Sequence, residues 1–198
     1  MAHSSQTGPA ASWLSPEPEV ARYVAFLRAI NVGQHTVKMA DLRRSFEAIG
    51  LASVESFIAS GNVGFEADAV DEAGLERRSE TALQGDLGYR VDTFVRTSKE
   101  LSEIAAHRPF DGLDVESRGW RLFIVLVGSR PKPETAARLT ALSSELDAFE
   151  VRNREIYWLV RGRYGDSKFS GALLERTLEM PATVRGAPTV RKIAARFS

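Results

Sequence analysis

The stretch Arg22–Gly33 (RYVAFLRAINVG), with the later tripeptide Ser60-Gly61-Asn62, decides the fold that we expect for this chain. Apolar residues fill nearly every position of its first nine residues, a pattern typical of a central strand that is buried on both faces. The strand then breaks off into a polar loop that contains glycine, and an amphipathic segment follows. Loops in this position, between a strand and a helix, often hold ligands. We therefore expect both the core and any binding site to be built around this stretch.

The composition excludes several classes of protein. The chain has 198 residues, of which 43% are apolar, and this suffices for the core of one domain or two small ones. Lys and Arg (26) balance Asp and Glu (26), so no overall charge draws the protein to nucleic acid or to an anionic membrane. No apolar run approaches the roughly 20 residues of a membrane span. Cysteine is absent, which favours a cytoplasmic location, and His3, His35 and His107 share no ligand spacing, so we expect no metal site.

Two sets of predicted elements follow one another along the chain. Helical spacing, short β-type runs and a Thr97–Glu100 capping box define the first set, and a polar linker at residues 110–119 separates it from the second. The first set has strands at 22–30, 54–58, 62–66 and 91–96, the last reading as an edge strand, and helices at 39–50, 70–87 and 97–109. The second has strands at 120–127, 148–152, 156–161 and 182–185, and helices at 133–146, 168–179 and 190–197.

Each set runs β-α-β-β-α-β and ends with a trailing helix. This order is the pattern of the ferredoxin-like sandwich, in which two helices cover one face of a four-stranded antiparallel sheet. We therefore predict an α+β fold of two tandem ferredoxin-like subdomains, at residues 20–109 and 120–198. Residues 1–19, rich in Ser, Ala and Pro, are predicted to form a flexible arm. A single mixed α+β domain without duplication is the alternative.

The predicted topology gathers polar residues at one end of the first sheet. A right-handed crossover makes the first two strands parallel, so the loop after the first strand lies at the same end as the hairpin tip. We expect Arg28, Asn31 and Gly33 to approach Gly61 and Asn62 there, with Ser60 as a further candidate ligand residue. The plainer interpretation pairs Arg28 with a surface carboxylate and explains the two asparagines by turn chemistry.

A second predicted group lies where the third and fourth strands of the second half end. Four cations and two hydroxyls around helix starts suit a carboxylate or phosphate ligand. They are Arg161, Arg163, Ser167 and Lys168 on one loop, with Arg185 and Thr189 on the other. A solvated basic loop is the plainer interpretation of the first loop. No catalytic triad, carboxylate pair, phosphate loop or dinucleotide pattern occurs, so catalytic residues and cofactors stay unassigned and an enzymatic activity stays open.

Four segments resemble the bacterial family known as domain of unknown function (DUF) 1697. They are YVAFLRAINVG (23–33), KMADLRRSFEAIG (38–50), FIASGNVGF (57–65) and TFVRTSKEL (93–101). The resemblance extends over residues 22–198 and implies two ferredoxin-like subdomains, but no established activity, substrate or cofactor. The chain departs from the family at Gly186, Ala187 and Pro188, where Asn, an aromatic residue and Asn are typical. This departure removes hydrogen-bonding and stacking groups, so a family site at this turn would bind differently here.

Three functions are compatible with these features. The first is a protein or enzyme that binds a small anion in a cleft between the subdomains. The second is a single-stranded RNA-binding module, suggested by residues 122–125 and 156–159, although the adjacent Tyr157 and Trp158 must face opposite sides of a strand. The zero net charge further argues against nucleic acid. The third is an interaction scaffold, monomeric or paired as a homodimer through an edge strand, with no membrane partner.

Overall fold

The computed structural model of the protein describes residues 20–30, 37–58, 61–68, 71–110, 113, 115 and 117–197. The predicted N-terminal arm lies outside these residues, as do Asn31, Gly33, His35 and Ser60. The fold is mixed α+β, with two four-stranded sheets that are antiparallel throughout. Six α-helices accompany the sheets within the described part of the chain.

The first half contributes four strands and three helices. They are β1 (Val20–Leu27), α1 (Met39–Ala48), β2 (Ala52–Ser56), β3 (Asn62–Asp68), α2 (Glu72–Leu87), β4 (Thr93–Thr97) and α3 (Ser98–Ala106). Its strand order is β2-β3-β1-β4, so β1 is central and β4 lies at an edge, as the sequence predicts. Because β1 and β2 are both antiparallel to β3, the end of β1 lies beside the start of β3, where Phe26 pairs with Asn62.

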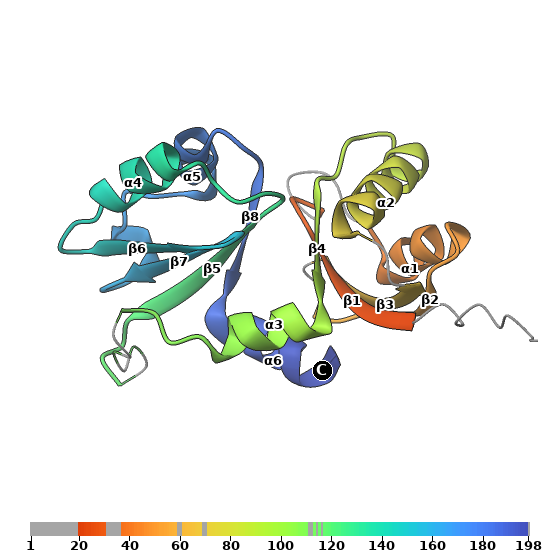
Figure 1. Ribbon diagram of the computed structural model, residues 1–198, viewed down its shortest axis with the longest axis horizontal. Helices are drawn as coiled ribbons and strands as arrows, with labels where there is room; N and C mark the ends of the chain where they lie inside the picture. Colours follow the sequence, from red (N-terminus) through yellow and green to blue (C-terminus); the bar gives the residue numbers. More distant parts are fainter. Residues whose placement is uncertain are drawn as a thin grey trace, which may run out of the picture.

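The second half repeats this order of elements. They are β5 (Arg121–Val127), α4 (Pro133–Ala141), β6 (Asp147–Arg152), β7 (Glu155–Val160), α5 (Gly171–Leu178), β8 (Ala182–Gly186) and α6 (Ala187–Phe197), with a short 3-10 helix at Tyr164–Asp166. The strand order, β6-β7-β5-β8, matches that of the first sheet position by position. Both edge strands β4 and β8 lie at the centre of the molecule (Figure 1).

The unbroken apolar run of β1 is explained by cores on both faces of the first sheet. Tyr23, Ala25 and Leu27 pack in the core beneath α1 and α2, whereas Val24 and Phe26 pack in a second core between the two sheets. Helices α3 and α6 fill the space between the sheets, and α4 and α5 cover the outer face of the second sheet (Figure 1). The inner faces of both sheets are therefore covered by the trailing helices.

Each trailing helix begins directly at the end of its half's edge strand. The predicted capping box is confirmed at α3, where the Thr97 hydroxyl accepts from the Glu100 N–H and the Glu100 carboxylate accepts from the Thr97 N–H. Both helices also reach the opposite half. The Tyr157 hydroxyl of β7 donates to the Ile104 carbonyl of α3, and the Phe197 ring of α6 lies against Gly64 of β3.

One predicted helix is too long. The spacing of Leu139, Leu142 and Leu146 predicts a helix to residue 146, but α4 ends at Ala141, and Leu142 and Leu146 are exposed. The Ser144 hydroxyl accepts from the backbone N–H groups of Leu146 and Asp147, which turns the chain into β6 instead. Short-range hydrogen bonds of serine thus end the helix before its apolar periodicity ends.

Candidate functional site

Arg185, near the end of β8, extends across the junction between the two halves. Its Nε–H donates to Asn62 Oδ1 at 2.8 Å, and its Nη2 donates to the Leu27 carbonyl at 3.0 Å and more weakly to the Gly61 carbonyl at 3.5 Å. Its Nη1 donates to the Thr183 hydroxyl at 2.7 Å. One guanidinium from the second half therefore links the end of β1 to the start of β3 in the first half by hydrogen bonds.

The charge of Arg185 lies in a poorly solvated position. The side chain is partly buried, and its guanidinium carbon lies 5.9 Å from the centre of the Phe26 ring. Burial lowers the pKa of Arg185 from 12.5 to about 10, because removal of water disfavours the charged form. Since this pKa still exceeds neutral pH by several units, Arg185 is a protonated cation at the centre of the molecule.

Asn62 is fully buried, and its side-chain amide forms hydrogen bonds both within its own hairpin and across the junction. Its amide nitrogen donates to the Phe57 carbonyl at 3.1 Å and to the Ile58 carbonyl at 3.5 Å, which holds the hairpin tip. Its amide oxygen accepts from Arg185. Asn62 therefore bonds the backbone of its own hairpin, as the turn interpretation expects, and the same side chain also joins the two predicted groups of residues.

Arg96, near the end of β4, makes the reciprocal contact with the second half. It is completely buried, and its Nε–H donates to a carboxylate oxygen of Glu155 at 2.7 Å. Its Nη2 donates to the Val127 carbonyl at 2.8 Å and to the Arg154 carbonyl at 3.1 Å, and its Nη1 donates to the Val95 carbonyl at 2.8 Å. Burial lowers the pKa of Arg96, and the carboxylate of Glu155 opposes that shift.

The two arginines occupy equivalent places in the two halves. Each is the second-to-last residue of its edge strand, and each donates to the last carbonyl of the opposite half's first strand and to the carbonyl just before that half's third strand. The first residue of the third strand accepts the Nε–H in both cases, but it is Glu155 for Arg96 and Asn62 for Arg185. A carboxylate in one half is thus replaced by a neutral amide in the other.

Arg28 follows the last residue of β1 and forms ion pairs. Its guanidinium donates to both carboxylate oxygens of Glu175 in α5, at 2.5 and 2.9 Å, and to Asp92 at 3.3 Å. This is the plainer of the two interpretations made from the sequence, with the addition that Glu175 belongs to the other half of the chain. Arg28 therefore stabilises the junction between the halves.

We expect this junction to weaken in acid. Burial alone would raise the pKa of Glu175, but hydrogen bonds from Arg28 and the Ala182 N–H and the charge of Arg28 outweigh it, so this pKa lies below its ordinary value of 4.5. The stabilisation is complete above that value and is lost as the pH falls toward the lower pKa of the folded state, because the unfolded chain binds the proton first. Urea midpoints measured from pH 6 to pH 3 should fall less steeply for Glu175→Gln than for the wild type.

Glu179→Gln is a suitable control for the acid series, because it makes the same change of formal charge at a largely exposed carboxylate, about one turn after Glu175. Identical pH profiles for Glu175→Gln and the wild type would contradict a role for this carboxylate in acid stability.

The remaining predicted residues lie elsewhere. Arg161 donates to the carbonyls of Ser144 and Glu145 and lies 5.6 Å from the Trp120 ring, all within the second half. Arg163 and Lys168 are exposed, as expected for a solvated loop, and Thr189 is partly buried in the first turn of α6. The structure therefore brings Asn62 and Arg185 into contact and places Arg28 directly after Leu27, whose carbonyl accepts from Arg185. The described contacts of Arg161 lie in another part of the molecule.

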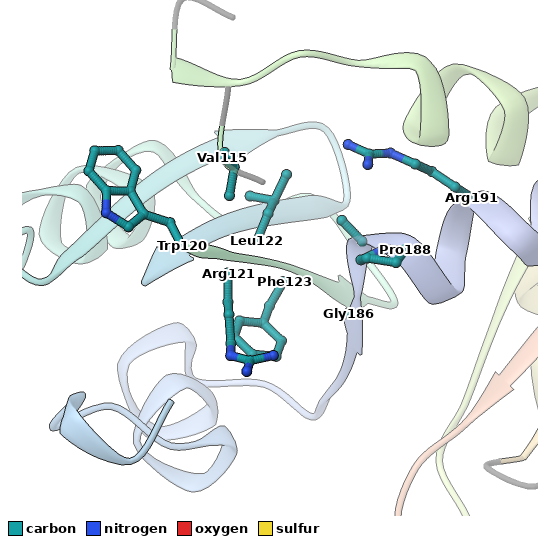
Figure 2. Close-up of a pocket in the computed structure, with 9 residues that line it drawn as sticks. Val115, Trp120, Arg121, Leu122, Phe123, Gly186, Pro188 and Arg191 are labelled. Atoms are coloured by element: carbon teal, nitrogen blue, oxygen red, sulfur yellow. The ribbon is translucent and has the colours of Figure 1, made fainter. Parts of the chain in front are cut away.

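A hollow of about 140 Å³ lies where β5 begins and β8 meets α6 (Figure 2). Nine residues line it, mostly apolar: Val115, Trp120, Arg121, Leu122, Phe123, Gly186, Ala187, Pro188 and Arg191. The turn at which the sequence departs from its family thus forms one wall of this hollow.

The aromatic side chains invoked for RNA binding are buried. Tyr157 packs in the core between the sheets and Trp158 in the core beneath α4 and α5, and both are at most 1% exposed. Stacking on single-stranded bases requires exposed rings on an open sheet face. That surface is absent from the described part of the second sheet.

The Arg96–Glu155 pair was not predicted from the sequence. The sequence does contain a pattern that marks this arginine. A Val-Arg pair stands just before the last residue of each edge strand, as Val95-Arg96 in TFVRT and Val184-Arg185 in ATVRG. Among the described residues, no group of three or more histidines and carboxylates is arranged to hold a metal ion. No described helix has both the length and the apolar character needed to cross a bilayer.

Comparison with known proteins identifies relatives at the level of sequence and of structure. A family described as "Protein of unknown function (DUF1697)" matches residues 20–157. The conserved bacterial protein SP0830 from Streptococcus pneumoniae has a similar structure, with a TM-score of 0.67 and 25% sequence identity over 90% of this chain and 98% of the other. No curated protein matches the sequence.

Proposed function

The chain belongs to the DUF1697 family, and from this premise we propose that it is a protein of two ferredoxin-like subdomains that binds a small anion at their junction, next to Arg185. The ferredoxin-like assignment is supported in both halves by the β-α-β-β-α-β order and by a strand order in which the first strand lies between the third and the fourth. The two subdomains would be residues 20–109 and 120–198, joined by the linker at 110–119.

The proposal rests on the replacement of Glu155 by Asn62 at the equivalent position. The pair of Arg96 with Glu155 is electrically neutral, whereas the pair of Arg185 with Asn62 carries a positive charge. In a poorly solvated place such a charge attracts anions more strongly than it would in water. A ligand carboxylate or phosphate that contacts Arg185 would place a negative charge beside its guanidinium, as Glu155 does beside Arg96.

The hydrogen bonds of Arg185 indicate how the anion would be bound. Its contact with the Gly61 carbonyl, at 3.5 Å, is the longest of its described bonds and the easiest to exchange. An oxyanion that takes over this Nη2–H gains a charge-assisted hydrogen bond, which is about twice as strong as a neutral one. Arginine suits this task because its planar fork matches carboxylate and phosphate geometry.

Thermal unfolding in the presence of small anions tests the proposal. Phosphate, citrate and succinate should raise the melting temperature above that in sodium chloride of equal ionic strength. A ligand at one hundred times its Kd adds about 2.7 kcal/mol to the free energy of unfolding. Absence of any specific anion effect in the wild type would contradict anion binding.

Two variants should abolish the anion response by different routes. Arg185→Gln removes the charge, and Asn62→Asp supplies an internal carboxylate at the position of Glu155. Arg90→Gln is the matched control, because Arg90 is an arginine of the first half that is 70% exposed. Retention of the full anion effect in Asn62→Asp, in a folded protein, would show that the charge of the Arg185 pair is not what anions recognise.

A further inference from the structure

The hollow beside Trp120 differs chemically from the Arg185 junction. We propose that it binds a flat aromatic ring that carries a carboxylate, as a second ligand site independent of the proposed anion site. The inference combines an apolar hollow of suitable size with an indole that is already in contact with guanidinium groups.

The shape of the hollow suits a small ring. Its volume of about 140 Å³ is close to the roughly 150 Å³ of an engineered apolar cavity that binds benzene. Val115, Leu122 and Pro188 supply apolar walls, and Figure 2 shows the Val115 and Leu122 side chains between Trp120 on one side and Arg191 on the other. A planar apolar group fits between these walls without the need to displace a buried polar side chain.

Trp120 provides the stacking surface. The ring is only partly buried, and the guanidinium carbons of Arg118 and Arg161 lie 4.9 and 5.6 Å from its centre. Arg118 is exposed, so it can move aside at little cost when another ring stacks on the indole. Aromatic pairs gain about 0.5–1.5 kcal/mol beyond the burial of their surface.

The charges around the hollow favour an anionic substituent on the ring. Arg121 and Arg191 line the hollow, and the two arginines that contact Trp120 lie beside it. Guanidinium groups recognise carboxylates through paired N–H donors, so a ring with a carboxylate at its edge satisfies both features. The flanking sequence also contains Asp111, Asp114 and Glu116, so the contribution of charge has to be measured directly.

Titration with 2-naphthoate, followed by isothermal calorimetry, tests the site. Its neutral counterpart 2-naphthalenemethanol has the same ring, and cyclohexanecarboxylate has the charge without the aromatic ring. We expect 2-naphthoate to bind about tenfold more tightly than either, because each lacks one of the two recognised features. Equal binding of the naphthoate and the alcohol would overturn the anionic part of the proposal.

Variants distinguish this site from the Arg185 junction. Trp120→Ala should weaken 2-naphthoate binding about tenfold, through lost stacking and burial. Arg161→Gln should weaken the naphthoate but leave the alcohol unchanged. Arg185→Gln should leave both unchanged, whatever it does to the effect of phosphate. Unchanged naphthoate affinity in Trp120→Ala, with native circular dichroism, would place the ligand elsewhere and overturn the proposal.

Discussion

Replacing Arg96 by methionine is expected to lower the free energy of unfolding by about 3–5 kcal/mol, the usual cost of removing one partner of a buried ion pair. Arg96 is fully buried and Glu155 is 5% exposed, so the variant leaves a carboxylate in the core without its cation. It also removes the donors that satisfy the carbonyls of Val127 and Arg154. Because these partners lie in the other half of the chain, loss of the ion pair should also weaken the packing between the halves.

Urea unfolding monitored by circular dichroism measures this loss. Arg96→Met with Glu155→Leu should be markedly more stable than Arg96→Met alone, because an apolar pair of similar volume has no charge left to desolvate. Arg90→Met is the control, and its loss should stay within about 1 kcal/mol because the Arg90 side chain is 70% exposed. A loss below about 1 kcal/mol for Arg96→Met would contradict a stabilising role for the buried Arg96–Glu155 pair.

Gly64→Ala should lower the free energy of unfolding by about 1–3 kcal/mol, because the added methyl group overpacks the core. A Cβ atom on Gly64 would lie 2.1 Å from Cε1 of Phe197 and 2.5 Å from Cδ1 and Cζ of the same ring. The ring is 4% exposed and cannot leave without opening the core between the sheets. Since Gly64 lies in β3 and Phe197 in α6, the close approach is a contact between the two halves.

When the Phe197 ring is absent, Gly64→Ala should no longer lower the free energy of unfolding. In the Phe197→Ala background, which itself costs about 3–5 kcal/mol, Gly64→Ala should be neutral or slightly stabilising, because glycine weakens a strand interior. Gly85→Ala in α2 makes the same substitution where no atom lies within 4 Å, and it should stabilise by about 0.5–1 kcal/mol. Melting temperatures of the wild type, the two single variants at positions 64 and 197, and the double variant measure this reversal. Destabilisation by Gly64→Ala in both backgrounds would exclude the contact with Phe197 as its cause.

The candidate site could be predicted in part. The prediction that the end of the first strand lies beside the hairpin tip needed only strand direction and crossover handedness, and β1 and β3 confirm it. The choice of Asn62 and Arg185 followed from polar residues at element ends, and these two side chains are in contact. The contacts of Arg161, in contrast, could not be predicted, because the sequence contains no measure of how far a loop lies from the junction.

By itself, the sequence determined the order and type of the elements. Apolar periodicity and capping residues act over a few positions, and β1, α3 and α6 formed where those short-range patterns indicated. Only the tertiary structure decided which residue each of the two arginines meets at the start of the opposite half's third strand. Arg96 is 59 residues from Glu155 and Arg185 is 123 residues from Asn62, so the Val-Arg pattern marks the two arginines but does not identify their partners. The physical reason is that charges are desolvated and paired when the two halves pack together, and that packing depends on contacts between residues far apart in the chain.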